Sequence, residues 1–176
     1  MIRSVLEYVS GILRAMIRIR PFQTSDASSL VAVFREAVTA LSRRDYSEDQ
    51  IAAWLKSLPD EDETRARCGD GRLTLVAASE PGEVVAFIEL ENDGHIDLLY
   101  AHPDVAGKGV ALGLFAELED HARSMGLSRL YVEASEPARR FFEKQGFRTT
   151  KRRDFVIHGV PIHNYAMEKD LAGGKV

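Results

Sequence analysis

The chain has 176 residues, of which 45% are hydrophobic and 28% charged, proportions typical of a soluble globular domain. Its formal net charge of −4 gives no reason to expect a nucleic-acid partner. No apolar run reaches the roughly 18 residues that a membrane span needs, and the single cysteine, Cys68, cannot form an internal disulfide, so we expect no membrane association and a cytoplasmic location.

The first predicted element lies in residues 1–15, where apolar residues recur at helical spacing between arginines. This pattern predicts an appended amphipathic helix, or an upstream extension of a chain that starts at Met16. Residues 17–22 alternate apolar and basic side chains, which is typical of a strand exposed on one face. We therefore expect one domain over residues 16–171, followed by a short tail at 172–176.

Two helices are predicted next. Apolar residues follow a helical period over 30–41, after the N-cap oxygens of residues 24–26. A second helix begins at Ser47, where Gln50 stands at capping-box spacing. The acidic run DEDE at 60–63 indicates a solvated loop or the start of a helix.

The remaining sequence predicts three strands, a helix, a strand, a helix and two strands. Their expected positions are 73–78, 84–90, 95–101, 107–125, 130–134, 136–145, 147–157 and 162–168. This order predicts a mixed α/β domain in which the long helix forms a right-handed parallel crossover. The nearly continuous apolar strand at 95–101 is typical of the middle of a covered sheet.

A glycine-rich turn, HPDVAGKGVALG at residues 102–113, joins that strand to the long helix. Successive backbone N–H groups in such a turn point into one small concavity, backed by the positive end of the helix dipole. Glycine lets the backbone approach a ligand closely, and Lys108 adds a positive charge. The stretch is therefore suited to bind a pyrophosphate.

Two phosphate-binding motifs are disfavoured here. A Walker P-loop requires Ser or Thr after its lysine, but Gly109 follows Lys108. A dinucleotide fingerprint requires a third glycine where this chain has Leu112, and it belongs in the first strand–helix turn of a fold.

The stretch HPDVAGKGVALGLF, followed by EASEPARRFFEKQGF, resembles the acyl-CoA signature of the GNAT N-acetyltransferases. The matching residues are Pro103, Gly107, Lys108, Gly109 and Ala111 in the first part, and Ala138, Phe141, Glu143, Lys144, Gly146 and Phe147 in the second. The resemblance covers essentially everything after Met16. It implies the GNAT fold, an α/β architecture with a central mixed sheet of about seven strands, flanked by about four helices and splayed between the fourth and fifth strands.

The resemblance also implies acetyl-CoA as co-substrate. It assigns Leu99, Tyr100 and Ala101 to the pantetheine arm, with Ser135 facing it from the other side. It assigns the backbone N–H groups of Gly107, Lys108, Gly109, Val110, Ala111 and Leu112 to the pyrophosphate. Two positions depart from the family pattern: Ala106 replaces a usual Gln or Arg, and Phe142 replaces a tyrosine that often protonates the leaving thiolate.

In this family the base that takes the proton of the amine often lies on the fourth strand. His95 and Asp97 stand there at a spacing of two, which predicts that they share a face with Leu99 and Ala101. The alternative for each is a structural role, a hydrogen bond for Asp97 and an exposed strand start for His95. Glu89 and Glu133 are weaker candidates, and the histidines lack the companions of a metal site, so we expect none.

The sequence thus predicts a GNAT enzyme that transfers the acetyl group of acetyl-CoA to a primary amine of a small molecule or peptide by direct attack. The two departures keep an alternative open, an acyl-CoA-binding sensor module with little catalysis. Dimerisation is common in the family that the chain resembles, so the resemblance leaves a homodimer open. The sequence does not identify the acceptor.

Overall fold

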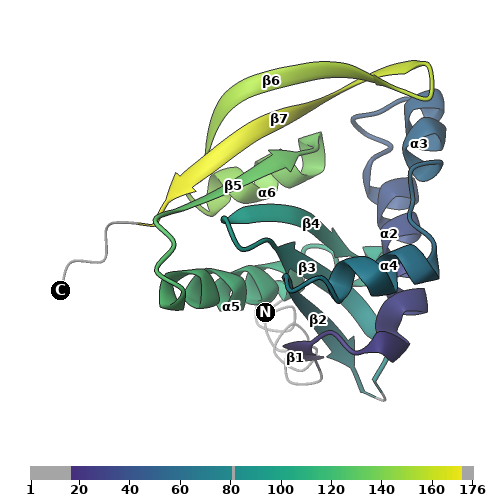
Figure 1. Cartoon of the computed structure of the whole chain (residues 1–176). Coiled ribbons are helices and arrows are strands. Elements are labelled where there is room, and N and C mark those ends of the chain that lie inside the picture. Colours follow the sequence, from purple (N-terminus) through teal and green to yellow (C-terminus); the bar gives the residue numbers. More distant parts are fainter. Residues whose placement is uncertain (1–16, 81, 172–176) are drawn as a thin grey trace, which may run out of the picture.

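A computed structural model describes residues 17–80 and 82–171, so the predicted extension at 1–15 and the tail at 172–176 lie outside the described residues. Seven strands form one sheet in the order β1-β2-β3-β4-β5-β7-β6 (Figure 1). The strands are β1 (Ile17–Pro21), β2 (Leu73–Ser79), β3 (Val84–Leu90), β4 (His95–Ala101), β5 (Arg129–Ala134), β6 (Arg148–Ile157) and β7 (Val160–Asp170). β4 and β5 run parallel and the other neighbouring pairs antiparallel, which confirms the predicted mixed sheet.

Helices cover both faces of this sheet (Figure 1). They are α2 (Ala27–Leu41), α3 (Glu48–Leu55), α4 (Glu61–Cys68), α5 (Val110–Ser124) and α6 (Glu136–Lys144), with short 3₁₀ turns η1 (Thr24–Asp26) and η2 (Pro103–Val105). One apolar cluster joins α5 and α6 to the sheet, and a second joins α2 and α3 to its opposite face. The fold is the predicted GNAT architecture.

The acidic run at 60–63 belongs to a complete helix, α4, which adds a fifth α-helix to the about four expected. The Asp60 side chain accepts a hydrogen bond from the Glu63 N–H at 2.9 Å, and the Glu63 carboxylate accepts one from the Asp60 N–H at 3.0 Å. This reciprocal cap satisfies two N–H groups at the helix start. The capping box, rather than an apolar face, therefore marks this helix, because Thr64 alone among its residues is buried.

The sheet splays between β4 and β5, as the resemblance implies. The two strands pair at only two positions, His95 with Tyr131 and Ile96 with Val132, and then diverge. Consequently β4 is mostly half-buried, although the sequence predicts a strand in a covered sheet. The divergence leaves one edge of β4 without a strand partner and opens a space beside it.

A β-bulge in β4 changes which side chains share a face. Ile88 pairs with Leu99 while Leu90 pairs with Ile96, so β4 has one more residue than β3 between these pairs. Ile96 and Leu99 consequently contact the same apolar cluster, whereas Leu98 contacts the cluster on the opposite face. The prediction that His95 and Asp97 share a face with Leu99 and Ala101 is therefore wrong, since Ile96 lies on that face and the bulge reverses the alternation between Ile96 and Leu99.

Candidate functional site

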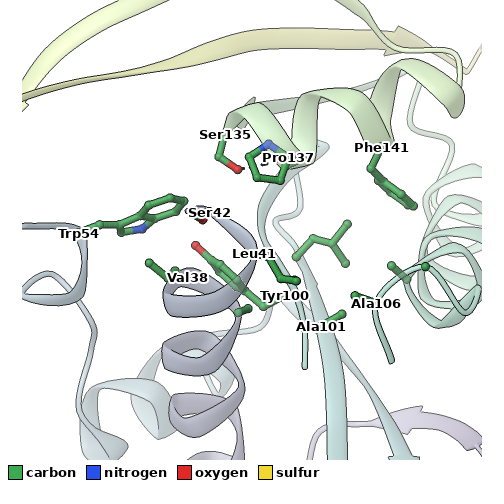
Figure 2. Close-up of a pocket in the computed structure, with 15 residues that line it drawn as sticks. Val38, Leu41, Ser42, Trp54, Tyr100, Ala101, Ala106, Ser135, Pro137 and Phe141 are labelled. Carbon is green, nitrogen blue, oxygen red and sulfur yellow. Dashed lines mark hydrogen bonds between the residues drawn. The ribbon is translucent and has the colours of Figure 1, made fainter. Parts of the chain in front are cut away.

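A cavity of about 240 Å³ lies beside the unpaired edge of β4 (Figure 2). Its walls come from α2, α3, β4, the turn before α5, and α6. The lining residues are Ala37, Val38, Leu41, Ser42, Trp54, Leu99, Tyr100, Ala101, Ala106, Gly107, Ala111, Ser135, Pro137, Ala138 and Phe141. Seven of the predicted ligand-binding residues are among them: Leu99, Tyr100, Ala101, Ala106, Gly107, Ala111 and Ser135.

The glycine-rich turn has the backbone conformation that glycine favours. Gly107 and Gly109 have φ values of 73° and 85°, in the left-handed region. α5 consequently begins at Val110, three residues later than predicted. Apart from its chain neighbours, no atom of residues 17–80 and 82–171 lies within 4 Å of where a Cβ at either glycine would stand, so the space above the turn is open among these residues.

The first amides of α5 have no acceptor within the helix. The Gly113 N–H donates to the Gly109 carbonyl at 3.0 Å, and the N–H groups of Val110, Ala111 and Leu112 precede this bond. Lys108 is exposed beside them, and the Leu112 side chain is exposed outside the cavity. Free amides, an adjacent lysine and open space together fit an anionic group such as a pyrophosphate.

The start of α6 forms the wall opposite β4. Ser135 caps this helix, with its Oγ accepting from the Ala138 N–H at 3.5 Å. Phe141, three residues after Ala138, presents its ring to the cavity (Figure 2). Phe142 is 1% exposed and packs edge-on against Phe115, so its side chain belongs to the core and does not line the cavity.

Polar side chains gather at one end of the cavity. Figure 2 shows the Tyr100 hydroxyl pointing toward Trp54 and Ser42, away from Ala106. The Tyr100 ring is stacked on Phe34 with centroids 4.1 Å apart. Burial raises the pKa of the Tyr100 phenol well above its usual value, so the hydroxyl keeps its proton throughout the physiological range.

Neither predicted base lines the cavity. Asp97 Oδ2 lies 2.7 Å from Arg72 Nη1, on the face of β4 that the bulge separates from Leu99. His95 lies with Nε2 at 2.7 Å from Glu133 Oε2 and Nδ1 at 3.3 Å from Glu91 Oε2. The structure therefore brings both predicted bases to one end of β4, with Asp97 in an ion pair with Arg72 and His95 between two carboxylates.

Beneath them lies a buried carboxylate. Glu89 is 0% exposed, and its Oε2 lies 3.2 Å from nitrogen atoms of both Arg67 and Arg72. Burial raises the pKa of Glu89, while the two guanidinium groups oppose that effect. Because Arg72 also contacts Asp97, it connects the buried carboxylate to the bulge of β4.

A second cluster, which sequence reasoning did not find, fixes α6 against β7. The Glu136 carboxylate accepts hydrogen bonds from the Tyr165 hydroxyl and from Arg139, and His163 Nε2 lies 3.2 Å from the same group. The Tyr46 hydroxyl donates to the His163 carbonyl and accepts from the Glu136 N–H, both at 3.0 Å. No local motif marks this cluster, because its members come from three separate segments.

Among residues 17–80 and 82–171, the side chains of His, Cys, Asp and Glu do not assemble into a group that could hold a metal ion. Within the same residues, the helices are all too short or too polar to cross a membrane.

Comparison with known proteins gives a consistent result. A family model for the GNAT acetyltransferase domain matches residues 42–169. The N-acetyltransferase YafP of Escherichia coli, itself uncharacterized, is 32% identical over 86% of this chain and 94% of its own length. The peptidyl-lysine N-acetyltransferase YjaB of Salmonella typhimurium is 29% identical over 83% of this chain and 93% of its own.

Solved structures agree with this. An N-acetyltransferase from Rhodopseudomonas palustris has a TM-score of 0.80 and 38% identity, covering 88% of this chain and 95% of its own. The PaiA N-acetyltransferase of Thermoplasma acidophilum, solved with coenzyme A, has a TM-score of 0.71 at 22% identity, covering 88% of this chain and 98% of its own, and shows the shared fold. The glycine-rich turn, the splayed sheet and these matches lead to one conclusion: the chain belongs to the GNAT family of acetyltransferases.

Proposed function

We propose that this protein is an N-acetyltransferase that transfers the acetyl group of acetyl-CoA to a primary amine of a small molecule or peptide, by direct attack of the amine. The observation that carries this proposal is the cavity between β4 and α6, which ends at the free amides of α5. Two relatives that match this chain over nearly their full length are named N-acetyltransferases, which supports the proposal. One of them is named a peptidyl-lysine N-acetyltransferase.

The residues present fit acetyl-CoA, which would supply the acetyl thioester. The backbone N–H groups of Gly107 and of residues 109–112, together with the Lys108 side chain, would bind the pyrophosphate at the start of α5. The Lys108 N–H, which the resemblance also assigns to this role, already donates to the Val105 carbonyl at 3.2 Å. The unpaired edge of β4 from Leu99 to Ala101 would pair with the amide groups of the pantetheine arm. Ser135 and the apolar walls would enclose the arm, and Ala106 provides a backbone contact without a polar side chain.

For the acceptor, an amine must lose a proton in order to attack. We propose that His95 and Asp97 take it. Since neither side chain lines the cavity, an intervening water would carry the proton to them. The carboxylates of Glu91 and Glu133 hold the His95 ring at its two nitrogens, and Asp97 can orient the water while Arg72 holds its carboxylate.

The test begins with a thermal-shift titration against acetyl-CoA, CoA, ATP and NAD. Binding to the folded state alone stabilises a protein by about 2.7 kcal/mol at a hundredfold excess over the dissociation constant. We expect stabilisation by acetyl-CoA and CoA and none by ATP or NAD; the reverse pattern, or no shift at all, contradicts the proposed function.

A panel of amines then follows, with release of free CoA thiol as the readout and lysine peptides and polyamines among the acceptors. Turnover with one class identifies the acceptor. Binding of acetyl-CoA without turnover of any amine would favour the sensor alternative. In an active enzyme, Asp97→Asn and His95→Gln should each lower kcat by about a hundredfold if both residues act as proposed.

A further inference from the structure

We propose that the acceptor of this enzyme is a weakly basic amine on an uncharged, apolar body, of the arylamine or arylhydrazine class, which enters the cavity without a positive charge. This inference rests on the proposed function and names the chemical class of its acceptor. It narrows the primary amines of small molecules and peptides to those that are neutral at physiological pH.

The first argument is where the acceptor would enter. The turn before α5 and the start of α6 lie on one face of the sheet, whereas α2 and α3 cover the opposite face, and the cavity is lined from both faces. Because the pyrophosphate of acetyl-CoA would lie at the start of α5, the amine would approach from the side of α2 and α3. This side, the acceptor end, is formed by Val38, Leu41, Ser42, Trp54 and Tyr100.

The second argument is the lack of charge at the acceptor end. Within residues 17–80 and 82–171, the lining of the cavity includes no Asp, Glu, Lys, Arg or His. The acceptor end consists of two aliphatic side chains, an indole, a phenol and a serine hydroxyl. An ammonium group that leaves water for such a place loses its hydration and gains no counter-charge, whereas a neutral amine avoids this cost.

Charged groups behind this wall are already paired with one another. Arg67, Asp97 and Glu89 act on the Tyr100 phenol through their charges. Glu89 Oε2 lies 3.2 Å from Arg67 Nε, and Asp97 Oδ2 lies 2.7 Å from Arg72 Nη1. Each of these carboxylates therefore has a guanidinium partner, which weakens its attraction for an ammonium group in the cavity.

The third argument is the low polarity that Tyr100 itself reports. Its hydroxyl points toward Trp54 and Ser42 in Figure 2, and burial is the main cause that raises the pKa of this phenol well above its usual value. Burial disfavours every charged form, so an environment that disfavours a phenolate also disfavours an ammonium group beside it.

The rings of the acceptor end are held in place. The Tyr100 ring is stacked on Phe34 with centroids 4.1 Å apart, and Trp54 lies edge-on to Tyr46 at 5.7 Å between centroids. Fixed aromatic walls favour a flat aromatic body, and the Tyr100 and Ser42 hydroxyls can form hydrogen bonds with a neutral amino group.

The transfer that follows is balanced. The lone pair of the neutral amine forms the C–N bond, the C–S bond breaks, and its electron pair leaves with the sulfur of CoA. The nitrogen then gives up one proton through water to the β4 bases of the proposed function, and the thiolate takes one proton from solvent.

A binding measurement tests the inference without turnover. CoA carries no acetyl group, so a protein saturated with CoA can bind an amine but cannot modify it. Aniline and cyclohexylamine are six-membered rings with one amino group, but at about pH 7 aniline is neutral and cyclohexylamine is a cation. We expect calorimetry to show aniline binding at least tenfold more tightly. Equal affinity, tighter binding of cyclohexylamine, or no binding of either amine would overturn the inference.

A pair of matched variants tests the place. Leu41 is half-buried in the wall, so Leu41→Asp adds a carboxylate to the acceptor end, while Leu41→Asn adds a group of similar size without charge. Relative to Leu41→Asn, Leu41→Asp should bind cyclohexylamine about tenfold more tightly and leave aniline unchanged. Trp54→Glu and Trp54→Gln repeat the comparison from α3, in case the first pair does not fold. Folded pairs that do not differ for cyclohexylamine would overturn the assignment.

Turnover with acetyl-CoA gives the final comparison. The wild type should acetylate 4-methoxyaniline and phenylhydrazine with kcat/KM at least tenfold above the values for spermidine and a lysine peptide. If the wild type does not bind CoA, or acetylates none of these amines, the proposed function has failed and this inference with it. If the wild type binds CoA and prefers spermidine or the lysine peptide, the proposed function stands and this inference alone has failed.

Discussion

Gly109 combines a left-handed backbone conformation with an open space. An alanine there keeps φ near 85°, which costs about 1 kcal/mol of folding free energy, and its methyl group occupies the space over the first amides of α5. We expect Gly109→Ala to weaken CoA at least tenfold while lowering stability only slightly, measured by calorimetry and chemical denaturation. Gly159→Ala provides the control, since Gly159 has a φ of 82° and equally open surroundings but does not line the cavity. Equal CoA affinity in the two variants would contradict the pyrophosphate site.

Gly94 has the opposite surroundings. Its φ is 96°, and an added Cβ would overlap the carbonyl oxygen of Arg129, where the turn between β3 and β4 meets the start of β5. The Gly94 carbonyl also accepts from the Tyr131 N–H at 3.0 Å, so the turn cannot move away freely. We expect Gly94→Ala to lower the free energy of unfolding by about 3 kcal/mol, clearly more than Gly159→Ala, in urea denaturation. A loss of unfolding free energy equal to that of Gly159→Ala would show that the start of β5 moves away from the added methyl group at little cost.

At the scale of elements, Glu136 fixes the start of α6 to β7. Burial alone would raise the pKa of its carboxyl group, but hydrogen bonds from Tyr165, His163 and Arg139 hold it at about 2, below the ordinary 4.5. The folded state therefore binds fewer protons than the unfolded state between these values, and this stabilisation is lost as pH falls through about 2.

We expect Glu136→Gln to reduce the free energy of unfolding by about 2 kcal/mol at pH 7, with the difference from wild type shrinking as pH falls from about 4.5 toward 2. Denaturant titrations across that window would measure it. Glu61→Gln, on the exposed surface of α4, serves as the control for replacing a carboxylate with an amide. A Glu136→Gln difference that stays constant over the window would rule out the charge as its source.

Features that depend on nearby residues could be predicted from the sequence, whereas features that depend on pairing between distant segments could not. The cap of α3 at Ser47 and Gln50 is local and was predicted correctly. The cap of α4 at Asp60 and Glu63 is equally local, but the acidic run obscured it because α4 has almost no apolar face. The bulge in β4 has no local signature, since an extra residue in a strand is defined only by its register with β3.

The candidate site divides in the same way. Four of the seven predicted lining residues lie in the two signature segments, because each segment carries its own turn and cap, and the other three lie at the end of the preceding strand. The wall supplied by α2 and α3, including Val38 and Trp54, depends on how distant helices pack. Phe142 belongs to the core while the adjacent Phe141 lines the cavity, so one step along the helix decides which ring faces the cavity.

At the scale of the whole molecule, the splay makes the sheet two parts joined by two residue pairs. The β4 amides beyond Ile96 that face β5 have no strand partner, so they should exchange with deuterium quickly in the free protein. Saturating CoA should slow exchange in β4 and at the start of α5 and leave α4 unchanged, as mass spectrometry of peptides would show. Protection spread evenly over all helices would indicate general tightening instead of binding between the strands.

Trp54 is the single tryptophan of the chain, and it lies in the wall of the cavity. All the indole fluorescence of the protein therefore originates in the wall of this cavity. The emission wavelength consequently depends on how much water contacts the Trp54 ring. Stopped-flow fluorescence can therefore follow ligand entry into the cavity without any added label.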